Sequence, residues 1–175
     1  MKNKFYIFYL IFFSIFFTKS FAENIIITAK NISLDKNNNT SIFQDEVIVE
    51  TQNKIIKSDF AKYDRKNGYL LLEKNITIED EKNNKLFTNF AEYNEIDEKF
   101  KTKGETKIIT EEKYLLEGQD LLIDNKKKII KSDKDSILKD QEGNKVLIEN
   151  FEYSVDTSIF KSIGRIIIED TKKNI

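Results

Sequence analysis

Hydrophobic residues recur along this chain with a period of thirty residues. Four copies of one footprint place apolar or small residues at the same relative positions, and a fifth copy precedes them, one residue out of step. A fixed period in this range indicates one supersecondary unit stacked several times, because each unit buries against its neighbours a face that it cannot bury alone. The footprints are Ile27-Ala29-Ile32-Leu34, Ile56-Ser58-Ala61-Tyr63, Leu86-Thr88-Ala91-Tyr93, Leu116-Gly118-Leu121-Ile123 and Val146-Ile148-Phe151-Tyr153.

Within a footprint the spacing is two residues, interrupted by one step of three, as between Ser58 and Ala61. A spacing of two predicts a β-strand, and the longer step predicts a β-bulge that returns the following residues to the same face. A polar turn over residues 64–68 follows, and a second alternating run begins at Leu70. Five units of two strands predict about ten strands in a single all-β domain with one apolar and one wet face.

The first 22 residues have the features of an export signal. Lys2 and Lys4 precede an apolar run over residues 5–17, and Ser20-Phe21-Ala22 has the small-x-small pattern of a cleavage site. The alternative, a retained membrane anchor, needs about 20 apolar residues, and this run is shorter. We therefore predict a cleaved signal peptide over residues 1–22 and a mature domain over residues 23–175.

Composition removes several classes of function. The chain has no cysteine and no histidine, which excludes disulfides, the usual zinc sites, thiol nucleophiles and triads centred on histidine. Its 29 Lys and Arg residues are balanced by 30 Asp and Glu residues, so the chain lacks the basic footprint of a nucleic-acid-binding protein. We expect no enzymatic activity, no metal, no cofactor and no nucleic-acid partner.

Both ends of the repeat array carry apolar, β-branched segments. These are Ile25-Ile26-Ile27 and Ile166-Ile167-Ile168, and the chain has no proline to blunt an exposed strand edge. Edges of this kind favour strand addition by a partner. The alternative is that the chain termini fold back over the edges.

The inward positions of the repeats have two interpretations that alternation alone leaves open. They form a closed core, or they line a groove for lipid chains, where burial gains about 0.8 kcal/mol per methylene. Small inward residues leave more room between the faces than a tightly packed sandwich does. These small residues are Ser58, Ala61, Thr88, Ala91 and Gly118.

The unit over residues 56–64, followed by a hairpin and the run over residues 70–78, resembles the repeat of the OstA-like family. The small-Asp-x-Ala-x-Tyr-Asp pattern of that family is matched best by residues 58–64 and more loosely by residues 88–94. Gly104 and Gly164 occupy the glycine position before the closing strand of the family's repeat, whereas Lys74 and Lys134 depart from it. The similarity covers residues 25–174. Members of the family include the periplasmic lipopolysaccharide-transport protein LptA and the N-terminal domain of the outer-membrane assembly protein LptD.

The resemblance implies a folded-over antiparallel sheet of the β-jellyroll or β-taco type in the periplasm. It implies an apolar interior that takes lipopolysaccharide acyl chains on their way to the outer membrane, and pairing of edge strands with homologous β-jellyroll domains. The alternative is a structural interaction module of the cell envelope without a lipid ligand. The implied groove residues are Ile56, Ala61, Tyr63, Leu70, Leu72, Ile76, Ile78, Leu86, Ala91, Tyr93, Phe100, Ile108, Leu116, Leu121, Ile123, Ile130, Leu138, Phe151 and Tyr153.

Within the family, two kinds of protein remain open. One is a free-standing bridge, and the other is the N-terminal domain of a larger protein associated with the outer membrane. Asn174 and Ile175 align with Lys54 and Ile55, which open the second unit. The array thus stops at the start of what would be a sixth repeat, and this stop favours the N-terminal portion of a longer protein.

Overall fold

The computed structural model describes residues 26–51 and 53–171, and the predicted signal peptide over residues 1–22 lies outside the described residues. The described residues form sixteen strands, and every pairing between them is antiparallel. The strands are β1 (Ile26–Thr28), β2 (Asn31–Asp35), β3 (Thr40–Glu50), β4 (Lys54–Asp64), β5 (Tyr69–Asp80), β6 (Lys85–Asn94), β7 (Lys99–Thr102), β8 (Glu105–Ile109), β9 (Leu115–Gln119), β10 (Leu122–Asp124), β11 (Ile129–Ser132), β12 (Ser136–Lys139), β13 (Lys145–Ile148), β14 (Phe151–Ser154), β15 (Ile159–Ser162) and β16 (Ile166–Glu169).

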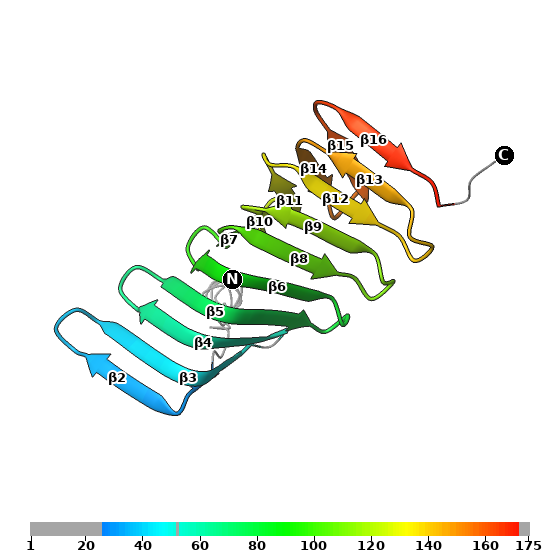
Figure 1. Cartoon of the computed structure of the whole chain (residues 1–175). Helices are drawn as coiled ribbons and strands as arrows, with labels where there is room; N and C mark the ends of the chain where they lie inside the picture. The colour runs from blue at the N-terminus through cyan, green and yellow to red at the C-terminus, as the bar shows by residue number, and fades with distance from the viewer. Residues whose placement is uncertain (1–25, 52, 172–175) are drawn as a thin grey trace, which may run out of the picture.

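The sheet is folded over on itself, and its long strands run through the fold. Residues 91–94 of β6 pair with β7, whereas residues 85–88 of the same strand pair with β8. From β7 onward the strands therefore belong to two layers. Layer A contains β7, β10, β11, β14 and β15, and layer B contains β8, β9, β12, β13 and β16. In Figure 1 the strands of layer B lie in front of those of layer A along this part of the chain.

The N-terminal end of the sheet is divided in the same way. β2 pairs with residues 40–44 of β3 and extends layer A, whereas β1 pairs with residues 48–50 of β3 and extends layer B. Within the described ranges, each layer begins and ends with a strand that has a single neighbour. These edge strands are β2 and β15 in layer A and β1 and β16 in layer B.

A bulge in each pair of long strands marks the line along which the sheet folds, here called the fold line. Between β4 and β5 the register shifts between Lys57 and Phe60, at the three-residue step that predicted a bulge. On β5, Lys74 takes a left-handed φ of 65°, and Gly104 holds the equivalent place in the next repeat with a φ of 80°. A left-handed residue beside a bulge turns the strand sharply, so the chain bends at both of these positions.

The bend also explains why the chain has more strands than the repeat pattern predicted. Beyond β6, pairing stops at the fold line, and each predicted strand becomes two short strands on opposite layers. β7 and β8, for example, are the two halves of one predicted strand, separated by Lys103 and Gly104. The predicted all-β, folded-over antiparallel sheet is confirmed, and the figure of about ten strands is corrected to sixteen for the described residues.

Polar turns close the hairpins with bonds that repeat along the chain. Asp64 Oδ2 accepts a hydrogen bond from the Asn67 side-chain amide at 2.6 Å, and its Oδ1 accepts from the backbone N–H groups of Lys66 and Asn67 at 3.0 and 3.1 Å. The Asn67 amide, together with these N–H groups, lowers the pKa of the Asp64 carboxyl below its ordinary value. Asp140 and Asn144 form the same arrangement at the opposite rim.

Candidate functional site

The interior between the two layers is apolar, and along the fold line its large and small side chains alternate. In layer A, Leu72 lies directly between Ala61 and Ala91, and none of these three residues is exposed at all. In layer B, Ile76 lies beside Thr88 and is buried as well. Alternation of large and small side chains lets two converging layers interdigitate without voids.

This packing changes the interpretation of the small inward residues. Ser58, Ala61, Thr88, Ala91 and Gly118 were expected to leave open space, yet all five are buried at the fold line. A larger side chain in place of Gly118 would collide with the neighbouring strand, because a Cβ at that position would stand 2.7 Å from Ser136 Oγ on β12. In the N-terminal half, small residues accommodate large neighbours and leave no open room.

Hydroxyl groups replace apolar side chains along the next part of the fold line. Thr102 Oγ1 accepts hydrogen bonds from the Leu121 backbone N–H at 2.9 Å and from the Thr106 hydroxyl at 2.7 Å. The Thr88 hydroxyl donates to the Glu105 carbonyl at 3.1 Å. Every buried side-chain nitrogen and oxygen among the described residues has a partner, so this polar row is satisfied internally.

The predicted groove residues all lie in the interior, in two clusters that meet near β8. Those near the fold line are buried, and so are Leu70, Leu86 and Phe100 nearer the rim, whereas the other residues toward the rim are partly exposed. The buried ones are Ala61, Leu70, Leu72, Ile76, Leu86, Ala91, Phe100, Leu121 and Phe151. The partly buried ones are Ile56, Tyr63, Ile78, Tyr93, Ile108, Leu116, Ile123, Ile130, Leu138 and Tyr153.

One tyrosine at the rim of layer A is bonded to a turn. The Tyr63 hydroxyl lies 3.2 Å from Glu95 Oε2, in the turn after β6. Partial burial and the bond to Glu95 both raise the pKa of the Tyr63 hydroxyl above its ordinary value. The hydroxyl therefore remains protonated at neutral pH and ties the rim of β4 to a neighbouring repeat.

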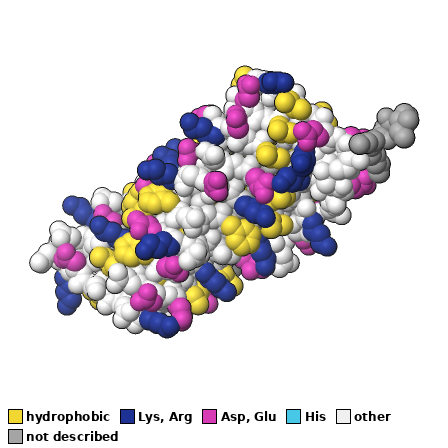
Figure 2. Space-filling view, in the orientation of Figure 1, with side chains coloured by type: hydrophobic (Ala, Val, Ile, Leu, Met, Phe, Trp, Pro, Cys, Tyr) yellow, Lys and Arg dark blue, Asp and Glu magenta, His cyan; other side chains and the backbone are white. Residues whose placement is uncertain are grey.

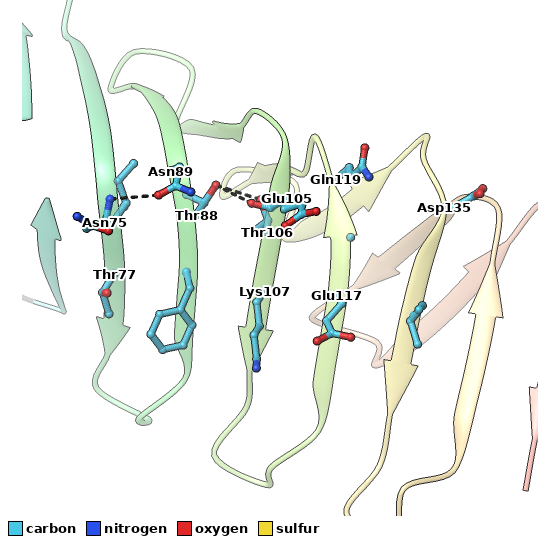
Figure 3. Close-up of a pocket in the computed structure, with 14 residues that line it drawn as sticks. Asn75, Thr77, Thr88, Asn89, Glu105, Thr106, Lys107, Glu117, Gln119 and Asp135 are labelled. Carbon is cyan, nitrogen blue, oxygen red and sulfur yellow. Dashed lines mark hydrogen bonds between the residues drawn. The ribbon is translucent and has the colours of Figure 1, made fainter.

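The outer face of layer B carries a shallow hollow that the repeat pattern did not predict. Its volume is about 760 Å³, and Figure 3 shows polar side chains around it. Outward residues of β5, β8 and β9, among them Thr77, Lys107 and Glu117, line it. Lys139 lies 2.6 Å from Glu117 and lowers the pKa of its carboxyl. In the sequence, this hollow is marked only by the polar residues that alternate with the apolar ones. Such residues occur on any solvent-exposed sheet face, so they do not single out a hollow.

The surface around this hollow is chemically mixed. Figure 2 shows Lys and Arg side chains interspersed with Asp and Glu side chains on the visible face, with scattered hydrophobic groups between them. Among the described residues, no three His, Cys, Asp or Glu side chains are grouped so that they could hold a metal ion. The same residues contain no helix long and apolar enough to cross a membrane.

The strand pairing and the interior define an all-β repeat protein built as one folded-over antiparallel sheet. No family model and no curated protein matches the chain. Among solved structures, it is similar to the crystal structure of LptH, the LptA homologous periplasmic component of the conserved lipopolysaccharide transport device from Pseudomonas aeruginosa. The match covers 85% of this chain and 96% of that chain, with 11% sequence identity and a TM-score of 0.35. The fold described above rests on the strand pairing of this chain itself.

Proposed function

We propose that this chain is a periplasmic lipid-binding domain that passes lipopolysaccharide acyl chains toward the outer membrane. It acts either as a bridge protein or as the N-terminal domain of an outer-membrane assembly protein. The observation that supports this function best is the continuous apolar interior, which is buried at the fold line and partly exposed toward the rim. The OstA-like repeat motifs and the predicted export signal support the periplasmic location.

The interior has the chemistry that an acyl chain requires. Each methylene moved from water onto an apolar surface gains about 0.8 kcal/mol, so a chain of twelve carbons gains roughly 10 kcal/mol before any cost of ordering. Partly exposed residues such as Ile108 and Leu138 offer that surface without a buried polar group to desolvate. No reacting group is needed, because transfer of a lipid makes and breaks no covalent bond.

Site-specific photocrosslinking tests the lipid ligand. With a benzophenone amino acid in place of Ile108, we expect saturable crosslinking to purified lipopolysaccharide, because this side chain faces the interior. The matched control is the same substitution at Lys107, the preceding residue of β8, which lines the outer hollow. Equal crosslinking at both positions, or none at Ile108, contradicts the proposed function.

The edge strands are the proposed contact with homologous domains. β16 is exposed along its whole length, with Ile168 at 73%, and β2 is exposed along its whole length as well. Among the residues that the structure describes, each has a single neighbouring strand, so one row of its backbone groups faces away from the sheet. Such edges pair readily with an added strand, and the charged or proline residues that usually prevent this are absent from the centre of β16.

Proline substitutions along β16 test this pairing. Backbone N–H groups of successive strand residues point to opposite edges, so of Ile166→Pro and Ile167→Pro one removes a bond to β13 and the other removes only an outward N–H. We expect the substitution that removes only the outward N–H to abolish concentration-dependent self-association with little loss of thermal stability. Analytical ultracentrifugation measures the self-association. Self-association that persists in both variants would rule out β16 as the docking edge.

A second candidate function is a structural interaction module without a lipid ligand. The observation that favours it is an outer apolar row on layer B, in which Ile137, Leu147 and Ile167 are direct cross-strand neighbours that reach the free edge. For such a module, a Leu147→Glu substitution would abolish partner binding, whereas Ile108→Glu would leave it intact.

A further inference from the structure

We propose that lipid enters only one segment of the interior, between β8 and β14, and that the sheet from β3 to β7 is closed by its own side chains. This inference rests on the proposed function. The two parts are here called the open segment and the closed segment. They differ in the floor at the fold line, in the walls toward the rim, and in how the two layers are joined.

Small residues form the middle of the floor of the open segment, between β9 and β12. Gly118, Ser132 and Ser136 are all buried there. The Ser132 hydroxyl donates to the Gln119 carbonyl at 2.6 Å, and the Ser136 hydroxyl bonds the Lys134 carbonyl at 3.1 Å. These hydroxyls turn to the backbone and are satisfied there, so they present little bulk and no unpaired polar atom to the interior. Among the described residues, the large apolar side chains buried in this segment are Leu121, Ile148 and Phe151.

The walls of the open segment are large and apolar, and they are partly exposed. In layer B they are Ile108, Leu116 and Leu138, and in layer A they are Ile123 and Ile130. Ile108, Leu116, Leu138 and Ile130 pack against the buried side chains of Leu121, Ile148 and Phe151 and still remain partly exposed. The result is a partly exposed apolar surface above a floor whose polar groups are paired, which suits the aliphatic part of a lipid.

In the closed segment, large residues alternate with small ones on the floor, and large residues are also buried at part of the rim. Leu72 and Ile76 are buried at the fold line, and at the rim level Leu70 and Leu86 are each only 6% exposed, with Phe100 at 7%. The strands β3 to β6 also run through the bend without interruption. Continuous strands hold the two layers at a fixed spacing, whereas in the open segment the layers are joined only by short connections such as 133–135.

The length of the open segment sets the size of its ligand. Its layer B strands are β8, β9, β12 and β13, and at about 4.8 Å between neighbouring strands they span about 14 Å. A fully extended saturated chain has bond geometry similar to an extended backbone, which advances about 3.5 Å for every three bonds, so twelve carbons span about 13 Å. The open segment therefore fits saturated acyl chains of about a dozen carbons laid across the strands.

Single cysteines test this division, because the natural chain has no cysteine to interfere. The open segment is probed with Leu138→Cys and Ile130→Cys, and the closed segment with Leu86→Cys and Leu70→Cys. Each pair of positions contains one residue from layer B and one from layer A. The measurement is the rate of labelling by N-ethylmaleimide, alone and with lauric acid or purified lipopolysaccharide. If Leu86→Cys does not fold, Ala91→Cys replaces it, since Ala91 is small and fully buried.

We expect cysteines at positions 138 and 130 to react in the free protein and to be protected about tenfold when lipid is present at ten times its Kd. Cysteines at positions 86 and 70 are expected to react only when the protein unfolds. Adding lipid should therefore slow their labelling by no more than the factor by which lipid stabilises the whole protein against unfolding. Equal reactivity and equal protection at all four positions overturn the division, while the proposed function stands. A difference in reactivity without any protection by either lipid overturns both.

Discussion

Replacing Leu72 by alanine is expected to lower the free energy of unfolding by about 3 to 5 kcal/mol, the upper part of the range for a large-to-small substitution in a core. Leu72 is completely buried, and its cross-strand neighbours on both sides are Ala61 and Ala91. Three alanines in a row at the fold line leave a cavity that continuous strands on either side cannot collapse to fill. Urea unfolding followed by circular dichroism measures the loss.

The matched control is Leu71→Ala, one residue earlier on β5. Leu71 faces outward between Lys62 and Glu92 and is only partly buried. Its truncation is expected to cost about 1 kcal/mol or less. A larger loss at Leu71 than at Leu72 would mean that β5 is registered with the opposite face inward, because a slip of one residue exchanges the two faces of a strand.

Replacing Thr102 by valine is expected to cost about 1 to 3 kcal/mol, although the two side chains have nearly the same shape. The Thr102 hydroxyl oxygen accepts from the Leu121 N–H and from the Thr106 hydroxyl, and both donors are buried. Valine removes the acceptor and leaves the Leu121 N–H unpaired at the point where layer A begins to separate from layer B. The same unfolding experiment measures the effect.

For this substitution Thr77→Val is the control, because Thr77 lies on the outer face of β5 and lines the outer hollow. Its stability is expected to change by no more than about 0.5 kcal/mol. If Thr102→Val is equally neutral, the hydroxyl row does not hold the fold line together. The open segment would then owe its shape to the apolar walls alone.

The interior face of the sheet could be predicted from the sequence. Spacing of two residues, with one step of three in the first strand of a unit and one step of four in the second, placed all nineteen implied groove residues on the inward face. Each of them lies in one of the two apolar clusters. This worked because a strand has a strict period of two and a bulge corrects that period by one residue. Their contact with lipid remains a prediction.

The bend was harder to predict, because the sequence does not mark it with one residue type. At position 104 the left-handed φ falls on glycine, the residue expected there, but at position 74 a lysine adopts the same left-handed conformation. At Lys74 the neighbouring Asn75 is held by Asp59 and Asn89, with bonds of 2.7 and 3.3 Å. Tertiary contacts stabilise a conformation that the local sequence disfavours.

The sequence by itself determined the repeat, the inward face and the bulge, because each depends only on the order of residues within about thirty positions. Only the tertiary structure decided which inward side chains are fully buried and which stay partly exposed. Leu86 and Leu138 are both inward leucines on layer B, yet the first is buried and the second is partly exposed. The strand that carries Leu86 crosses the fold line, whereas the strand that carries Leu138 stops at it. The contacts that bury a side chain join parts of the chain that local spacing does not relate.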